Sequence, residues 1–297
     1  MTSTLSIASG ALVARVAPHG GELMSLVHRG VERLWHGDPA WWDYRAPLLF
    51  PVIGRSPDDR VRVAGVAHPM PGHGFARDRD FAVLRADATS ALLEQRDDAA
   101  TRAMFPFAFA LRVGFEVAGD ALAIAAEIAN RGDAPMPFGF GYHPGFLWPA
   151  ADESRREDHV CRFEKPEDGP VRRARSGTGL LLRDPVPRPF PGRTLTPVDA
   201  MFERGSLQFE AVRSRWVWFG PRGGAGLRVA FPDSPQLGVW TRPGAPYLCI
   251  EPWQGLAEAE GADGELAHRP GARVLAPGAS ATYRMTIACG IGDPGDG

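Results

Sequence analysis

Three short segments, far apart in the chain, each place one proton-transfer side chain beside glycine or proline and an aromatic residue. They are HGFAR at residues 73–77, GYHPGF at 141–146 and CIEPW at 249–253. Two imidazoles and one carboxylate can form an acid/base site once the fold brings the segments together. A sugar ring offers both C–H faces and hydroxyl edges, so aromatic surfaces beside polar groups suit it. The segments therefore predict a pocket for a small polyhydroxylated ring.

His143 and Glu251 are the candidates for proton transfer. His143 lies in PMPFGFGYHPGFLWP, where prolines and glycines hold the backbone on an irregular path, and an imidazole exchanges protons near neutral pH. Glu251 follows the apolar run YLCI, so we expect a carboxylate that has lost water at the end of a buried strand, suited to a general base. The structural alternatives are a turn-capping histidine and a carboxylate satisfied by backbone amides. The presence of both groups favours catalysis.

Four further residues are candidates for contacts with the ring. His73 stands between two glycines, which let a backbone approach a ligand closely. Arg55 ends the run APLLFPVIGR, and its guanidinium can donate to two adjacent hydroxyls. Phe75 and Trp253 supply apolar faces. An exposed turn histidine and a surface arginine are the alternatives for the first two.

The composition excludes several classes of function. A formal net charge of −2 over 297 residues gives no reason to expect binding to nucleic acid or to an anionic membrane. Lys165 is the one lysine and lies in a charged, loop-like stretch, so Schiff-base chemistry is not expected. The three cysteines form no CxxC, which argues against a disulfide framework or a zinc knuckle. The first residues carry no long apolar run, so we expect a cytoplasmic protein without a signal peptide or membrane span.

Short alternating runs, separated by many of the 35 glycines and 28 prolines, predict an all-β fold in the form of a large antiparallel β-sandwich. The runs are 11–16, 81–84, 91–95, 107–117, 122–130, 207–212, 216–219, 226–231, 237–241, 247–250 and 281–288. The stretch 151–200 is rich in proline and charge, and we interpret it as a long excursion within one domain. The sequence therefore predicts a single domain over 1–291 and a flexible tail at 292–297.

The same segments resemble the aldose 1-epimerase (galactose mutarotase-like) family. The resemblance runs from GGELMSLVHRGVERLWHGDPAWW through APLLFPVIGR, HGFARDRDF and GYHPGF to LGVWTRPGAPYLCIEPWQG. It implies a β-sandwich of the galactose mutarotase-like kind and catalysis without a metal or an organic cofactor. Glu251 matches the family's general base at O1 and His143 its general acid at the ring oxygen. His73 and Arg55 match sugar-contacting positions.

One family element has no clear counterpart. Members often place an aspartate on a sugar hydroxyl in the stretch that reads LTPVDAMFERGSLQF here, where Asp199 is the nearest candidate. The expected activity is interconversion of the α and β anomers of an aldose. A hexose-6-phosphate 1-epimerase and a non-catalytic carbohydrate-binding protein of the same fold are the alternatives. The expected partner is a small-molecule sugar, and the sequence leaves the oligomeric state open.

Two other enzyme classes fit the sequence less well. A cupin-like oxygenase takes two metal ligands from one strand as H-x-H, and the sequence contains no H-x-H. A glycoside hydrolase needs two facing carboxylates, and no second carboxylate shares the context of Glu251. For an epimerase we expect His143 to face Glu251 across a pocket that holds one pyranose, with neither group buried in the core. If Arg55 and Arg77 both point into that pocket, they can bind the phosphate group of a sugar phosphate. An ion pair between Arg77 and Asp78 instead favours a neutral sugar.

Overall fold

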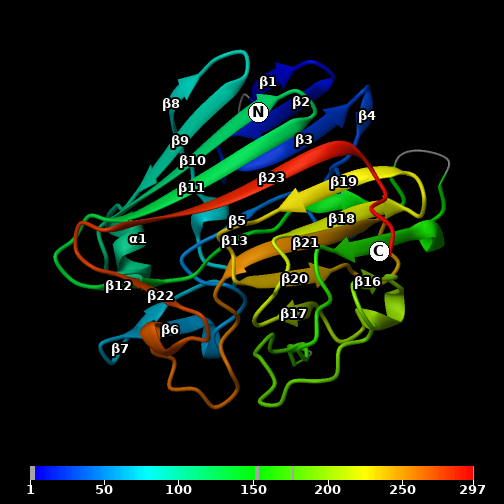
Figure 1. The fold of residues 1–297 in the computed structure, drawn as a ribbon. Helices are drawn as coiled ribbons and strands as arrows, with labels where there is room; N and C mark the ends of the chain where they lie inside the picture. The colour runs from blue at the N-terminus through cyan, green and yellow to red at the C-terminus, as the bar shows by residue number, and fades with distance from the viewer. Residues whose placement is uncertain (1–3, 151–153, 176, 297) are drawn as a thin grey trace.

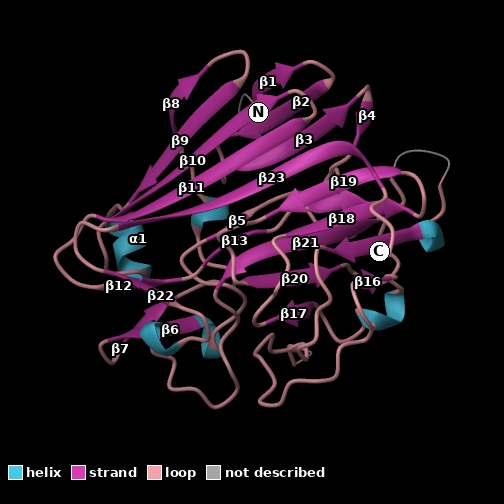
Figure 2. Ribbon diagram, viewed as in Figure 1, coloured by secondary structure: helices cyan, strands magenta, loops and turns pink. Residues whose placement is uncertain are grey.

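The computed structural model describes residues 4–150, 154–175 and 177–296, and nearly all of its regular structure is β (Figure 1; Figure 2). The all-β, antiparallel architecture predicted from the short alternating runs is confirmed. One six-residue α-helix lies among the described residues, α1 at Ala99–Met104, and the Asp98 side chain caps it by accepting a hydrogen bond from the Thr101 N–H at 2.7 Å.

Nine strands of the described chain form the largest sheet, which is antiparallel throughout (Figure 1). Their order is β16 (Thr194–Leu195), β15 (His159–Phe163), β18 (Trp216–Pro221), β19 (Ala225–Ala230), β23 (Ser280–Gly292), β11 (Ala121–Asn130), β10 (Phe109–Ala118), β9 (Ser90–Arg96) and β8 (Ala82–Ala86). Buried and more exposed residues alternate along β11 and much of β23, because successive side chains of a strand point to opposite faces of the sheet.

A second antiparallel sheet carries two of the three segments that the sequence singles out. Within the described residues its order is β17 (Leu207–Phe209), β20 (Gln236–Trp240), β21 (Tyr247–Gln254), β13 (Phe140–Tyr142) and β5 (Leu48–Leu49), and β14 (Gly145–Leu147) also pairs with β21. Figure 1 shows this sheet lying below the nine-stranded one.

The remaining strands of the described chain form three smaller sheets. They are β1 (Leu5–Ser9), β2 (Leu12–Ala17), β3 (Glu22–His28) and β4 (Val31–Glu32) in one sheet, β6 (Arg60–Val63) with β7 (Val66–Pro69), and β12 (Met136–Phe138) with β22 (Arg273–Leu275). Short 3₁₀ turns lie at Pro57–Asp59, Ala76–Asp78, Arg156–Asp158, Asp199–Met201 and Leu266–His268. No helix in the described part of the chain is long and apolar enough to cross a membrane.

One apolar cluster joins the two large sheets. Val113 and Ile128 contribute from the nine-stranded sheet, and Leu248 and Ile250 contribute from β21. The alternate residues of β21 point to the opposite face of their sheet, where Trp253 belongs to a separate buried cluster. β21 is therefore covered on both faces, which is why it resembles a continuous apolar run in the sequence.

The stretch interpreted as an excursion, 151–200, has two roles in its described part. β15 and β16 join the nine-stranded sheet, whereas the loop between them crosses to the second sheet. There Arg172 forms an isolated bridge with Gln208, and Leu181 forms one with Ala259. The loop thereby pairs with the edge strand β17, and Leu181 packs in the same buried cluster as Trp253.

The described residues 292–296 of the predicted tail make specific contacts with the sheet. β23 continues to Gly292, and the buried Asp293 carboxylate accepts hydrogen bonds from Arg162 Nε at 2.5 Å and from the Gly223 N–H at 2.9 Å. Asp296 also pairs with Arg162. Ion pairing to a buried arginine therefore attaches this segment to the nine-stranded sheet through Asp296.

Candidate functional site

A single row of cross-strand neighbours forms the floor of the site. β21 pairs with β13 at Trp253 and Gly141, and with β14 in the same register at Cys249 and Gly145, so that register places His143 opposite Glu251. On the other side of Glu251 the row continues through Gly238 of β20 to Gln208 of β17. Residues directly opposite one another in antiparallel strands point to the same face. His143, Glu251 and Gln208 therefore project together.

Two prolines interrupt the hydrogen-bond ladder beside this row. Neither Pro144 nor Pro252 has an N–H to donate, so the pairing of β21 with its neighbour is broken where His143 leaves the strand. The Ile250 N–H still donates to the Pro144 carbonyl at 3.3 Å. The sequence predicts Glu251 at the end of a strand. That prediction is wrong, because β21 continues through Gln254.

His143 and Glu251 are in direct contact. Nε2 of His143 lies 2.9 Å from Oε2 of Glu251, and the two residues are 7% and 1% exposed. The expectation that they face each other across the pocket is therefore wrong. Both line the pocket, and neither belongs to an apolar core cluster. The 2.9 Å approach does not have hydrogen-bond geometry, so neither carboxylate oxygen of Glu251 has a hydrogen-bond partner among the described residues. Nδ1 of His143 also has none among them. Buried polar groups of this kind are normally satisfied, so they indicate a polar ligand.

Aromatic rings hold the histidine in place. The Trp42 ring lies 4.8 Å from the His143 ring between centroids, and Trp240 lies edge-on at 5.8 Å. The His73 ring approaches from a third direction at 5.7 Å. This packing restricts rotation of the imidazole and keeps it beside Glu251.

Trp253 lies flat on the sheet because its neighbours are glycines. A Cβ at Gly141 would stand 2.5 Å from the indole Cδ1, and a Cβ at Gly238 would stand 2.5 Å from Cη2. Real Cβ atoms do not approach so closely, so both positions require glycine for this placement. The indole Nε1 is buried and has no hydrogen-bond partner among the residues that the structure describes.

The opposite wall joins the GR and HGF segments through His73 and Gly54. The His73 N–H donates to the Gly54 carbonyl at 2.8 Å, and the Gly54 N–H donates to Nδ1 of His73 at 3.2 Å. Because Nδ1 accepts, the ring proton of a neutral imidazole resides on Nε2, which becomes a donor. Burial, and then the charges of His143 and of nearby arginines, hold the pKa of His73 well below its usual range. His73 is therefore a neutral hydrogen-bond donor.

Two arginines line the pocket in different states. Arg77 Nη2 donates to the Gly72 carbonyl at 2.9 Å, its Nε lies 3.7 Å from the Asp78 carboxylate, and its guanidinium lies 4.6 Å from the centre of the Tyr44 ring. The Arg55 guanidinium is exposed and forms no hydrogen bond or ion pair with the described residues. Arg77 is thus engaged, whereas Arg55 is available to a ligand.

A buried ion pair supports the Arg55 loop from behind. Arg269 Nη1 lies 3.4 Å from the Glu258 carboxylate and donates to Ser56 Oγ at 2.6 Å, while Nη2 donates to the Ile53 carbonyl at 2.6 Å. Burial lowers the pKa of Arg269 to about 10 and raises the pKa of Glu258. The guanidinium therefore fixes the backbone that positions Arg55.

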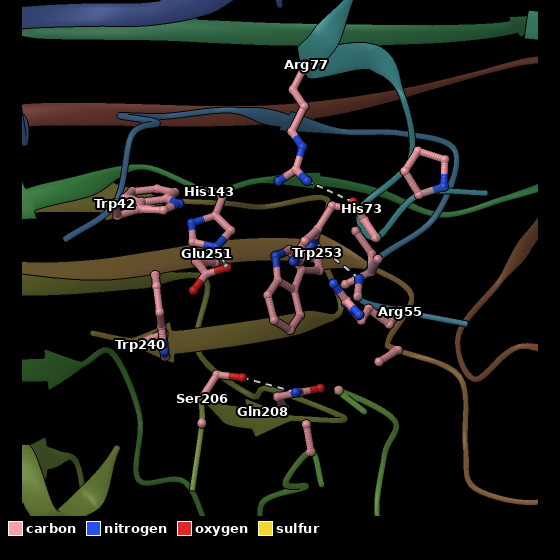
Figure 3. A pocket seen from close by; sticks show the side chains of 18 of the residues that line it. Trp42, Arg55, His73, Arg77, His143, Ser206, Gln208, Trp240, Glu251 and Trp253 are labelled. Atoms are coloured by element: carbon pink, nitrogen blue, oxygen red, sulfur yellow. Dashed lines mark hydrogen bonds and ion pairs between the residues drawn. The ribbon is translucent and has the colours of Figure 1, made fainter. Parts of the chain in front are cut away.

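These walls enclose a pocket of about 550 Å³ (Figure 3). The predicted residues that line it are His143, Glu251, His73, Arg55 and Trp253. The structure therefore brings together five of the six predicted site residues. Figure 3 shows Ser206 and Gln208 closing one side of the pocket, opposite Arg77. Ala174 and Gly179, from the excursion, complete that side.

Phe75 lies outside the pocket, contrary to the prediction. Its ring is buried in the main apolar cluster, with ring centroids 6.0 Å from those of Phe50 and Phe109. Its backbone does help to shape the HGF segment, since its N–H donates to the Phe50 carbonyl at 2.9 Å. Phe75 is therefore a core residue, although it lies two positions from His73 in the sequence.

The stretch LTPVDAMFERGSLQF contributes to the pocket without its aspartate. Asp199 pairs instead with Arg156, at 2.7 Å between Oδ1 and Nη2, and does not line the pocket. Ser206 and Gln208 line the pocket in place of the aspartate, and Gln208 Nε2 donates a 3.0 Å hydrogen bond to Ser206 Oγ. Neither residue is among those predicted from the sequence. The alternation of SLQF, which sets Ser206 just before β17 and Gln208 within it on one face, is the signal that identifies them.

One set of side chains has the composition of a metal site. His143, Cys249 and Glu251 are all buried, and one potential ligand atom from each lies within 4.8 Å of the others. Cys249 and Glu251 are two residues apart on β21 and point to the same face.

The comparisons with known proteins agree with this architecture. The model of the aldose 1-epimerase family matches residues 3–288. The chromosomal LacX protein of Lactococcus lactis is 29% identical over 267 residues, which cover 86% of this chain and 88% of LacX. A galactose mutarotase related enzyme from Lactobacillus acidophilus has a TM-score of 0.88 and 28% identity over 97% of both chains. A galactose mutarotase-like protein from Lactobacillus casei also has a TM-score of 0.88, at 27% identity over 96% of this chain and 99% of its own.

Proposed function

Because this chain belongs to the aldose 1-epimerase family, we propose that it interconverts the α and β anomers of an aldose by acid/base-catalysed ring opening. The observation that carries the proposal is the contact between His143 and Glu251 on the pocket floor, with neither carboxylate oxygen hydrogen-bonded to any described residue. A buried polar group without a partner costs about 1–3 kcal/mol, so a sugar hydroxyl that satisfies it gains binding energy.

The reaction needs an acid and a base side by side. The hydroxyl oxygen O1 and the ring oxygen of a cyclic aldose are both bonded to C1. Glu251 takes the proton from O1 while the imidazolium of His143 gives one to the ring oxygen, the bond from C1 to the ring oxygen breaks, and an open-chain aldehyde forms. Groups 2.9 Å apart can reach two oxygens on one carbon.

The return step reverses the two proton transfers. Rotation about the C1–C2 bond presents the other face of the aldehyde to the ring hydroxyl. That hydroxyl adds to C1 and gives its proton back to His143, while the aldehyde oxygen recovers a proton from Glu251. Both residues end in their starting states. Positioned acid and base groups each contribute roughly 10²–10⁴-fold, which suits a reaction that already proceeds slowly in water.

The other walls supply binding rather than chemistry. The Trp253 indole offers a flat apolar surface for a C–H face of the ring, and Nε2–H of neutral His73 donates to a hydroxyl. Arg55 and Gln208 can contact further hydroxyls from two sides of the pocket. This division leaves His143 and Glu251 free to act at C1.

A neutral aldose is the preferred substrate in this proposal. Arg77 is engaged by Gly72, Asp78 and Tyr44, which leaves Arg55 as the guanidinium available to a ligand among these two. A phosphate clamp normally combines several charge-assisted bonds. A hexose 6-phosphate remains the alternative, supported by the presence of both arginines in the pocket lining.

Exchange of anomers, measured by NMR or polarimetry on several aldoses and their 6-phosphates, tests the proposal. We expect acceleration for at least one neutral aldose. A preference of at least about tenfold for a 6-phosphate over its parent sugar, or about 1.4 kcal/mol, would replace the neutral substrate by the phosphorylated one. Sugar binding without acceleration for any member of the panel would favour a non-catalytic carbohydrate-binding protein.

A further inference from the structure

Cys249 stands directly beside the two proton carriers but takes no part in the proposed reaction. It precedes Glu251 by two residues on β21 and points to the same face, and its register partner in β14 is Gly145. A Cβ at Gly145 would lie 3.4 Å from the Cys249 sulfur and 3.0 Å from the Trp42 ring. The thiol is thus packed behind the catalytic pair, with its potential ligand atom within 4.8 Å of theirs.

The three donors form a set that zinc prefers. Zinc binds imidazole nitrogen and carboxylate oxygen at about 2.0–2.2 Å and thiolate sulfur at about 2.3 Å, in tetrahedral geometry. Those bond lengths put ligand atoms about 3.3–3.6 Å apart. The 2.9 Å separation of His143 and Glu251 lies below this range, and the three potential ligand atoms lie within 4.8 Å of one another, so side-chain shifts of about 1 Å are needed to admit an ion.

Apart from its contact with His143, itself a proposed ligand, the carboxylate lacks competing partners among the described residues. Glu251 is 1% exposed, and neither of its oxygens is hydrogen-bonded to any residue in the described ranges. His143 is 7% exposed and its Nδ1 is unpartnered in the same way. A metal ion therefore has no existing hydrogen bonds to break at the carboxylate. His143 and Glu251 line the pocket, so an arriving ion can reach them and a fourth position is left for water.

We propose that His143, Cys249 and Glu251 form an inhibitory zinc site within the catalytic centre. A bound ion occupies the lone pairs of both proton carriers, so neither can accept or give a proton while the metal is present. The inhibitory reading rests on the proposed epimerase activity, whereas binding of the metal itself does not. The site differs from a catalytic metal centre, because the reaction proceeds without the ion.

Proton release accompanies binding. The Cys249 thiol loses its proton to solvent as the sulfur binds the metal, because the thiolate is the ligand. Burial, and then the charge of Glu251, raise the pKa of Cys249 well above its usual range. Metal affinity should therefore increase with pH.

Cobalt binding tests the site without any activity assay. Titration of the whole protein with Co²⁺ should give a 1:1 complex with a thiolate-to-metal charge-transfer absorption in the near ultraviolet, and Zn²⁺ should displace it. The absorption should vanish in Cys249→Ala. It should persist in Cys289→Ala, a matched control at another buried cysteine in β23. Absence of the charge-transfer absorption in the wild-type protein, or its persistence in Cys249→Ala, would overturn the proposal.

Zinc inhibition of anomer exchange then tests the consequence. Wild type and Cys289→Ala should be inhibited by Zn²⁺ and restored by a chelator. Cys249→Ala should keep exchange in the absence of zinc and need at least about tenfold more Zn²⁺ for the same inhibition, since even second-sphere changes cost 10–100-fold in metal affinity. Equal inhibition of all three proteins contradicts the site. If no aldose is turned over, the cobalt titration still decides whether the site exists, and the failure falls on the proposed function.

Discussion

Gly238→Ala probes whether the flat placement of Trp253 depends on the missing side chain beneath it. The new Cβ would lie 2.5, 2.6 and 3.1 Å from three atoms of the indole. Carbon atoms rest about 3.5–4.0 Å apart, so the ring must move by roughly 1 Å, away from the sheet and into the pocket. Overpacking of this kind costs about 1–3 kcal/mol.

The magnitude includes an opposing contribution. Replacing glycine by alanine at a compatible backbone position stabilises a protein by about 0.4–1 kcal/mol through the unfolded chain. The net loss of unfolding free energy for Gly238→Ala should therefore be about 0–2.6 kcal/mol. Displacement of a sugar-stacking ring by about 1 Å should also lower the exchange rate by up to about 10²-fold.

Gly114→Ala is the matched control. Gly114 lies inside β10, and a Cβ there would meet Leu92 Cδ1 at 3.8 Å and the Ala125 carbonyl at 3.9 Å, which are ordinary contacts. Urea unfolding should show this variant as stable as wild type or slightly more so. In a Trp253→Phe background, where the ring no longer extends over Gly238, the cost of Gly238→Ala should fall by about 0.5–3 kcal/mol. Equal stability of the two alanine variants, with no coupling to Trp253, would refute the argument.

Three further perturbations test other parts of the structure. Acid should destabilise His73→Gln less than it destabilises wild type. The pKa of His73 is lowered in the folded protein, whereas that of a histidine in the unfolded chain is about 6.5, so below that pH the unfolded chain binds more protons and wild-type stability falls by up to about 1.4 kcal/mol per pH unit. Urea unfolding at two pH values measures this slope in both proteins. Glu258→Leu should lower the free energy of unfolding by about 3–5 kcal/mol, because it leaves the Arg269 guanidinium buried without its ion-pair partner. The double variant Glu258→Leu with Arg269→Met should recover part of that loss. A loss below about 1 kcal/mol in the single variant contradicts this. Phe75→Leu should lower stability by about 1 kcal/mol and leave KM unchanged, since the ring packs in the core; a raised KM at unchanged stability would restore its predicted contact with the sugar.

The sequence predicts the strands well where one face of a strand meets solvent. The runs 107–117 and 122–130 coincide closely with β10 and β11, whose alternating side chains signal a half-buried strand. The 2-residue period is hidden in β21, because both of its faces are covered. For this reason the sequence predicts Glu251 at the end of a strand, whereas the structure places it within one.

Side-chain direction limited the prediction of the site. Proton-transfer residues beside glycine and proline identify His143, His73 and Glu251 as candidates, because their types carry the chemistry. Whether Phe75 points to the pocket or to the core depends on tertiary packing, which its neighbours in sequence do not determine. The contact between His143 and Glu251 depends on the pairing register of segments about a hundred residues apart, and no local pattern specifies that register.

The most direct test of the account is the rate of anomer exchange in Glu251→Gln. The substitution keeps the shape of the side chain and removes its basicity, and Glu116→Gln, an exposed change in β10, is the matched control. We predict that Glu251→Gln folds normally, still binds sugar and exchanges anomers at least about 10²-fold more slowly than wild type, while Glu116→Gln retains full activity. Exchange by Glu251→Gln at a rate close to that of wild type would contradict the role of Glu251 as the base.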